Sequence, residues 1–239
     1  MGISLSTAQV LAPLSFAVDF GAQLYGMLSS PNMKQIHDRN MSAFSPYANM
    51  IGYFFFPQQI LQLWWLRRLW TNPEPEQVKY VPYYALGNFC IAGWMLFWVH
   101  ASKFSSNIQN TESFGASQAL VTINTLSQLF YVTTMLPPRT PENTVTHLVA
   151  KTFAGIGVLD LLHNGAVALY PGVAPNTLVK ALTGVGFGLG ALASDGIMGF
   201  CLVYDLFSLY LGQKGDWKML LGAYTLGAAG IVGYRRLMS

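Results

Sequence analysis

Charged side chains are the scarcest feature of this sequence. Only 10% of its 239 residues are Asp, Glu, Lys or Arg, whereas soluble domains contain roughly 25%. Hydrophobic residues make up 52% of the chain, and the mean hydropathy is +0.37. So few charges cannot cover the surface of a soluble globule of this size, and we therefore expect a polytopic integral membrane protein. This composition excludes most cytosolic enzymes and disordered linkers.

Basic runs and paired cysteines are lacking as well. The net charge of +3 arises from 13 basic residues that are scattered along the chain. No basic stripe is present that could follow a phosphate backbone, so we expect no nucleic-acid partner. The two cysteines, Cys90 and Cys201, both fall in apolar stretches, where free buried thiols are favoured over a disulfide.

Seven apolar stretches approach the length of about 20 residues that a membrane-spanning helix needs. Breakers such as Ser30-Pro31-Asn32 and Pro137-Pro138 lie between them. The sixth stretch is long, which predicts a helix that is tilted, kinked near Gly196 or extended beyond the membrane. We therefore predict an all-α fold, a single transmembrane domain over residues 1–239 with about seven helices. The stretches cover residues 8–29, 47–70, 82–101, 115–136, 145–170, 179–210 and 218–236.

An internal repeat is faintly visible. Asp19-x-x-x-Gln23-Leu24-Tyr25 recurs as Asn124-x-x-x-Gln128-Leu129-Phe130, 105 residues later. This pattern favours two related three-helix units followed by a seventh helix, although chance similarity between apolar segments explains it equally well. Across the predicted loops the basic residues divide seven against six, so the positive-inside rule gives no orientation. We expect a multi-pass protein of a membrane that the sequence does not identify, with an intracellular endomembrane favoured.

Polar side chains inside the apolar stretches are the best guide to a site. In hydrocarbon such groups must face the bundle interior, a cavity or a partner. Six of the seven stretches carry them, which predicts a shared interior pocket for a lipophilic small molecule. Structural roles compete with this prediction, because amides serve as interhelical hydrogen-bond partners and deep aromatic rings as core packing. The candidate substrate-binding residues are Asp19, Gln23, Gln59, Asn88, Trp94, Trp98, Asn124, Gln128, Asn164 and Asp205.

Three further residues are candidate catalytic groups. Asp160 and Asp195 have no lysine or arginine nearby on their own predicted helices. An unpaired carboxyl group in an apolar interior is expected to stay largely protonated, and it could then donate that proton. His163 lies one helical turn from Asp160, so a hydrogen bond between them could tune the acid or relay a proton. Burial of these groups for structural reasons remains the competing explanation.

No cofactor or metal is expected. A b-type haem normally takes two imidazoles at matched depth, and His163 is the one histidine placed deep in a predicted helix. It also lacks the clustered ligands of a metal site. The glycines at 184, 186, 188 and 190 lie in an apolar helix with no preceding strand, so they favour close helix packing over phosphate binding.

Two motifs carry a family resemblance. Ser45-Pro46-Tyr47 followed by Ile51-Gly52-Tyr53-Phe54-Phe55, and Leu86-Gly87-Asn88 followed by Ala92-Gly93-Trp94, resemble the translocator / tryptophan-rich sensory protein (TspO-like) superfamily, in particular its larger seven-helix relatives. The resemblance covers at most residues 40–165. It implies a helical bundle around a pocket for tetrapyrroles or sterols. The additional helices and the aspartates of this chain depart from the family pattern.

Three functions are therefore open from the sequence. The first is a membrane enzyme that protonates an isoprenoid-type lipid, in the class of terpene cyclases and isomerases. The second is a protein of the translocator type that binds or transports a lipophilic ligand. The third is a structural subunit of a larger membrane complex. The acids and deep aromatic residues favour the first, and nothing in the sequence identifies a substrate or an oligomeric state.

Overall fold

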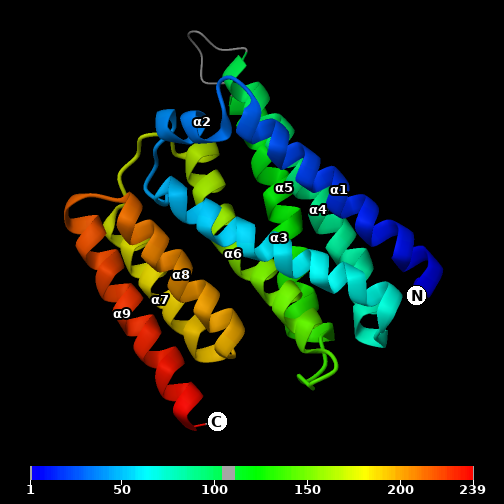
Figure 1. The fold of residues 1–239 in the computed structure, drawn as a ribbon. Helices are drawn as coiled ribbons and strands as arrows, with labels where there is room; N and C mark the ends of the chain where they lie inside the picture. The colour runs from blue at the N-terminus through cyan, green and yellow to red at the C-terminus, as the bar shows by residue number, and fades with distance from the viewer. Residues whose placement is uncertain (1, 104–110, 239) are drawn as a thin grey trace.

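The computed structural model describes residues 2–103 and 111–238, and these residues form an all-helical fold without strands (Figure 1). Eight long helices alternate in direction, and the short helix α2 lies at one end of the bundle. The helices are α1 (Leu5–Leu28), α2 (Met33–Arg39), α3 (Ala48–Thr71), α4 (Pro75–Lys103), α5 (Thr111–Phe130) with its π-helical continuation η1 (Tyr131–Met135), α6 (Thr144–Leu169), α7 (Thr177–Ala193), α8 (Gly196–Gly212) and α9 (Gly215–Met238).

The predicted count of seven long helices is wrong by one. The sixth apolar stretch forms two helices, α7 and α8, joined by a sharp turn at Ser194 and Asp195. Asp195 has extended backbone, and its side chain accepts a hydrogen bond from the N–H of Met198 at 3.1 Å. Asp is a preferred N-cap because its carboxylate satisfies an N–H that the helix leaves free. The predicted kink near Gly196 is therefore a complete reversal, and two three-helix units plus a seventh helix do not describe this fold.

The helices pack in a layer that follows the chain only in part. α1 lies beside α4, α4 beside α5, and α5 beside α6. α6 then contacts α8, which packs with α9 and α7 as a three-helix unit at the edge of the molecule (Figure 1). α3 crosses this layer and contacts α1, α6 and α8. Because the number of long helices is even, both termini lie at the end of the bundle opposite α2.

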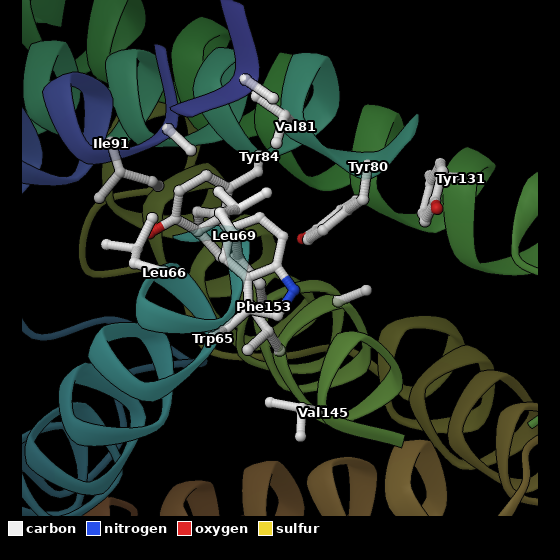
Figure 2. Packing of buried hydrophobic residues seen from close by; sticks show 14 residues of the cluster. Trp65, Leu66, Leu69, Tyr80, Val81, Tyr84, Ile91, Tyr131, Val145 and Phe153 are labelled. Atoms are coloured by element: carbon white, nitrogen blue, oxygen red, sulfur yellow. The ribbon is translucent and has the colours of Figure 1, made fainter. Parts of the chain in front are cut away.

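The largest cluster of buried side chains joins α3, α4 and α6. Figure 2 shows Trp65 of α3 packed beside Tyr84 of α4 and close to Phe153 of α6. The ring centroids of Trp65 and Tyr84 are 4.7 Å apart, and the Trp65 indole N–H donates to the Thr146 hydroxyl at 3.0 Å. Buried aromatic rings that also satisfy their polar atoms stabilise a packed interior. This cluster holds α3 across the layer and so forms one end of the cavity wall described below.

Hydropathy identifies one candidate membrane span among the described residues. α6 is long and apolar enough to cross a bilayer, whereas α7 and α8 are apolar but shorter. About 56% of the most apolar part of α6 is buried inside the bundle, and the buried core helix of a soluble protein passes the same test. The remaining helices fall below this threshold.

Candidate functional site

A cavity of about 440 Å³ lies between α1, α2, α3, α4 and α6. Its walls are mostly apolar and aromatic, with carboxyl, amide and imidazole groups at a few positions. This combination is typical of pockets for small lipophilic molecules, whose polar groups fix the orientation of the ligand. The lining includes Asp19, Gln23, Lys34, His37, Gly52, Phe54, Gln58, Gln59, Gln62, Trp94, Trp98, Asp160 and His163.

The structure brings seven of the predicted site residues to this cavity. They come from four helices that are distant in sequence, and packing alone assembles them. Asp19 and Gln23 are one turn apart on α1, and the Gln23 amide donates to the Asp19 carboxyl group at 3.1 Å. The rings of Trp94 and Trp98 are 5.9 Å apart. The seven residues are Asp19, Gln23, Gln59, Trp94, Trp98, Asp160 and His163.

Asp160 faces the cavity with its carboxyl group unengaged. Its side chain makes neither a hydrogen bond nor an ion pair with any described residue, although its backbone carbonyl accepts from the Asn164 amide at 2.9 Å. Asn164 in turn accepts a 2.7 Å hydrogen bond from the Trp94 indole. Asn164 is not among the residues that line the cavity, but its hydrogen bond holds the edge of the Trp94 ring, which does line it.

Two histidines meet at the α2 end of the cavity. His37 Nδ1 lies 3.1 Å from His163 Nε2, and His37 Nε2 lies 3.1 Å from the Pro46 carbonyl oxygen. On the other side, His163 Nδ1 lies 3.3 Å from the Ser45 hydroxyl, which accepts from the N–H of Ser42 at 2.8 Å. Trp98 packs against His163 with a centroid separation of 5.7 Å.

The chemistry of the partners fixes which atom donates in each hydrogen bond of this series. A carbonyl oxygen only accepts, so His37 Nε2 must carry a proton, and in a neutral ring Nδ1 is then an acceptor. His163 Nε2–H donates to it, which leaves His163 Nδ1 to accept from the Ser45 hydroxyl. The series of hydrogen bonds thus runs from the Ser45 hydroxyl through His163 and His37 to the Pro46 carbonyl, with both imidazole rings neutral. Burial lowers the pKa of His37 and is the dominant cause; the Asp38 charge and the Pro46 carbonyl oppose it to a smaller extent, and the Lys34 charge adds the smallest effect, which also lowers the pKa.

The expected hydrogen bond between Asp160 and His163 is not formed. Both ring nitrogens of His163 are engaged by Ser45 and His37, so the imidazole does not hold the acid. The two side chains share the cavity without direct contact through hydrogen bonds. The spacing of Asp160 and His163 in the sequence allowed a hydrogen bond between them. His163 instead contacts His37 and Ser45, which both lie more than 110 residues away in the sequence.

Besides Asn164, three of the predicted amides lie outside the cavity. Asn88 donates to the Ser15 hydroxyl at 3.3 Å, between α4 and α1. Gln128 accepts from the Tyr80 hydroxyl at 2.7 Å and donates to the Tyr83 carbonyl at 2.8 Å. Asn124 is buried beside Gly87 at the same α4–α5 contact. Asn88 and Gln128 thus join neighbouring helices, which is the structural role that competed with ligand binding, whereas both amide atoms of Asn124 have no hydrogen-bond partner among the described residues.

The other two predicted acids also lie outside it. Asp195 was expected to lack a basic partner, and that expectation is wrong, because Lys151 Nζ lies 2.5 Å from its carboxylate. Partial burial acts to raise the pKa of Asp195, but Lys151 and the first N–H groups of α8 together lower it. Asp195 therefore caps a helix as an ionised, paired group. Asp205 is fully buried on α8 and does not line the cavity; its carboxyl group has no hydrogen-bond partner within the described part of the chain, and it interacts electrostatically with Asp160.

The sequence reasoning missed His37, Ser45 and Gln58. His37 lies in a segment that was expected to be a loop, whereas Asn32 and Gln35 form a capping box that begins α2 there. An Asn followed three residues later by Gln was the available signal. Ser45 lies within the motif of the family resemblance but was given no role. Among the described residues no group of three His, Cys, Asp or Glu side chains could hold a metal ion.

Comparison with known proteins gives no relative. No protein-family model, no curated protein and no solved structure matches this chain.

Proposed function

We propose that this chain is a multi-pass membrane protein. The distribution of polar and apolar side chains supports the proposal, because it is inverted relative to that of a soluble protein. Asp19, Gln23, Asn88, Gln128 and Asp205 are at most 5% exposed. Large apolar residues lie on the outside instead, and soluble monomers rarely expose contiguous patches of that kind.

Helix α7 gives the clearest example of this inversion. Leu178, Leu182, Val185, Leu189 and Leu192 recur at helical spacing along one face, and each is 54–64% exposed. Such a stripe needs an apolar environment over the whole length of the helix, and the acyl chains of lipids provide one. With eight crossings the basic residues again divide seven against six between the two ends, so the orientation stays open.

For such a membrane protein we propose that an isoprenoid-type lipid binds in the cavity and is protonated there by the Asp160 side chain. The single observation that carries this proposal is an acidic side chain in an aromatic cavity that has neither a hydrogen-bond partner nor an ion-pair partner among the described residues. An apolar environment favours the uncharged form of a carboxyl group, which is the form that donates a proton. The faces of the Trp94 and Trp98 rings could stabilise the positive charge that follows.

The proposed step balances without an oxidant or a second substrate. The proton of the Asp160 carboxyl group adds to a carbon–carbon double bond, whose π electrons form the new C–H bond and leave a carbocation. An internal double bond can then attack this centre and close a ring. Finally a carbon next to the cation loses a proton to the Asp160 carboxylate, and a new double bond forms. The product is an isomer of the substrate, and the acid is restored.

The experiment compares Asp160→Asn with the wild type on a lipid extract from the source membrane. An amide retains the shape of the side chain but cannot donate the proton, so turnover should fall by at least the factor of about 10² to 10⁴ typical of a general acid. Binding of the same lipid should persist. Asp195→Asn is the matched control, since it makes the same change outside the cavity, and its turnover should equal that of the wild type.

Turnover of the Asp160→Asn variant at the wild-type rate would exclude the acid role. Each variant should first be shown to be monodisperse in detergent, so that loss of fold is not read as loss of chemistry. Full solubility of the wild type without detergent would instead exclude the membrane placement.

Ligand binding without chemistry is the second candidate function. The Gln58 amide nitrogen and the Gln59 amide oxygen are buried at the cavity wall and have no hydrogen-bond partner within the described chain. Unpartnered donors and acceptors at a cavity favour a ligand that carries a hydroxyl or carbonyl group. The resemblance to the translocator superfamily also favours this function. In that case Asp160→Asn should change the affinity modestly and no product should form.

A further inference from the structure

The α3 wall of the main cavity carries three glutamines on one side of the helix. Gln58 and Gln59 precede Gln62 by four and three residues, a spacing that places their side chains on the same side. All three line the cavity and are at most 9% exposed. Buried amides normally have hydrogen-bond partners, so three of them on one wall require an explanation.

Gln62 has a structural partner, whereas Gln58 and Gln59 have none among the described residues. Gln62 Oε1 accepts a 2.7 Å hydrogen bond from the Tyr84 hydroxyl, which joins α3 to α4. Neither amide of the other two bonds to the described chain, and the Gln58 nitrogen and the Gln59 oxygen are buried. A buried amide without a partner costs free energy, and a ligand that bonds to it offsets that cost. Gln58 and Gln59 therefore mark the polar part of a ligand site.

The chemistry of this amide pair selects a hydroxyl group. An amide nitrogen only donates and an amide oxygen only accepts, so the pair presents a buried donor on Gln58 and a buried acceptor on Gln59. A hydroxyl accepts from the first and donates to the second, whereas a ketone satisfies only the donor. Each amide carries both kinds of atom, so the match holds whichever way either group is turned.

The charges at the cavity disfavour an anionic ligand. Asp19 and Asp160 line it, and Lys34 is the basic residue other than histidine among its described lining residues. Lys34 Nζ lies 2.6 Å from the Asp38 carboxylate, so its charge is already paired. A carboxylate or diphosphate would enter this apolar site without an unpaired cation, which costs far more than the burial of a hydroxyl.

The volume of the cavity sets the size of the ligand. A water-sized group occupies about 30 Å³ of a liquid, so a cavity of about 440 Å³ holds about 15 non-hydrogen atoms, which is the size of farnesol. From these observations we infer that the cavity binds a neutral isoprenoid alcohol of this size. Its hydroxyl bonds to Gln58 and Gln59, and its hydrocarbon part lies along rings such as Phe54 and Trp94. The inference rests on the ligand cavity proposed above and narrows its substrate class from lipids to alcohols.

The test measures equilibrium binding of tritiated farnesol to the purified full-length protein in a neutral detergent. Unlabelled farnesol, the hydrocarbon farnesene and farnesyl diphosphate compete with it. We expect farnesol to compete about tenfold better than the other two compounds, since the hydrocarbon leaves both amides unpaired and the diphosphate lacks a cation. Equal competition by farnesene or by farnesyl diphosphate, or no binding of farnesol, would overturn the inference.

Two variants place the hydroxyl. Gln58→Leu and Gln59→Leu should each weaken farnesol binding about tenfold and leave competition by farnesene unchanged. Gln9→Leu is the matched control, because it makes the same change on α1 outside the cavity, where Gln9 donates to the Leu69 carbonyl. All comparisons use one detergent concentration, so that partition of each compound into micelles cancels. Wild-type farnesol binding in both cavity variants would refute the placement of the hydroxyl.

Thermal unfolding of the same variants separates ligand binding from a structural role. Because neither amide bonds to the described chain, Gln58→Leu and Gln59→Leu should melt at or above the wild-type temperature. A lower melting temperature would show that the glutamines hold the fold, against the inference. Turnover of Asp160→Asn is a separate measurement: a wild-type rate there would refute the acid and leave alcohol binding in place.

Discussion

His37 and His163 are 126 residues apart in sequence, yet His37 Nδ1 lies 3.1 Å from His163 Nε2. The pair can hold one additional proton, because either ring can then donate from both of its nitrogens. It cannot hold two, since the nitrogens that face each other would then both carry protons. The pair is therefore a site at the α2 end of the cavity whose hydrogen bonds depend on pH.

The first prediction concerns this pH dependence. Burial lowers the pKa of His37 below the ordinary value of 6.5 that the unfolded chain retains. Below pH 6.5 the unfolded chain therefore binds more protons than the folded one at this residue, and stability falls as the pH falls. We expect the melting temperature to drop less between pH 7.5 and 5.5 in His37→Asn than in the wild type, measured in the same detergent. Equal slopes would contradict a buried neutral His37.

The second prediction tests the close approach of Gly212 to the backbone at Ser45 and Tyr47. A methyl group added at Gly212 would lie 2.4 Å from the Ser45 carbonyl oxygen and 2.6 Å from the Tyr47 nitrogen. These are backbone atoms that cannot move aside cheaply, so Gly212→Ala should destabilise the fold by about 1–3 kcal/mol. Gly188→Ala on α7 is the control, because it meets nothing within 4 Å. It should leave stability unchanged or raise it by up to about 1 kcal/mol in a denaturation experiment.

The third prediction separates the two roles of Asp195. Asp195→Asn keeps an N-cap acceptor and loses only the charge pair with Lys151, which is partly exposed. Such a pair contributes at most about 1 kcal/mol. Asp195→Ala loses the cap as well, so its stability should fall by a further amount of about 1 kcal/mol. Thermal unfolding of the two variants measures this difference, and equal stabilities would show that the cap contributes nothing.

The fourth prediction tests whether the cavity is a ligand site. Gly52 lines the cavity, and a Cβ atom added there meets no atom within 4 Å. Gly52→Leu should therefore fold normally and occupy the space of the ligand. Gly21→Leu makes the same change in open space on α1, outside the cavity. We expect copurified lipophilic material, identified by mass spectrometry of an organic extract, to decrease only in Gly52→Leu. Equal amounts in both variants would show that the ligand lies elsewhere.

The helical segments and several of their boundaries follow from local sequence patterns alone. Apolar stretches separated by Pro, Gly and Asn predicted the all-helical fold, because propensity and capping act over a few residues. The buried free thiols of Cys90 and Cys201 were also predicted correctly, since both lie within apolar helices. The turn at Ser194-Asp195-Gly196 was readable from the same local chemistry, although the stretch was long enough to pass for one helix.

Which polar side chains share a cavity depends on how the helices pack against one another. Periodicity places Asp160 and His163 on one face of α6, but packing rotates that face toward residues of α1, α2, α3 and α4. It likewise brings Lys151 to Asp195 across 44 residues and His37 to His163. A hydrogen bond or an ion pair forms only where the distance between two side chains of different helices is correct to within a few tenths of an ångström. Those distances follow from the shape of the whole packed interior, which no local pattern in the sequence encodes.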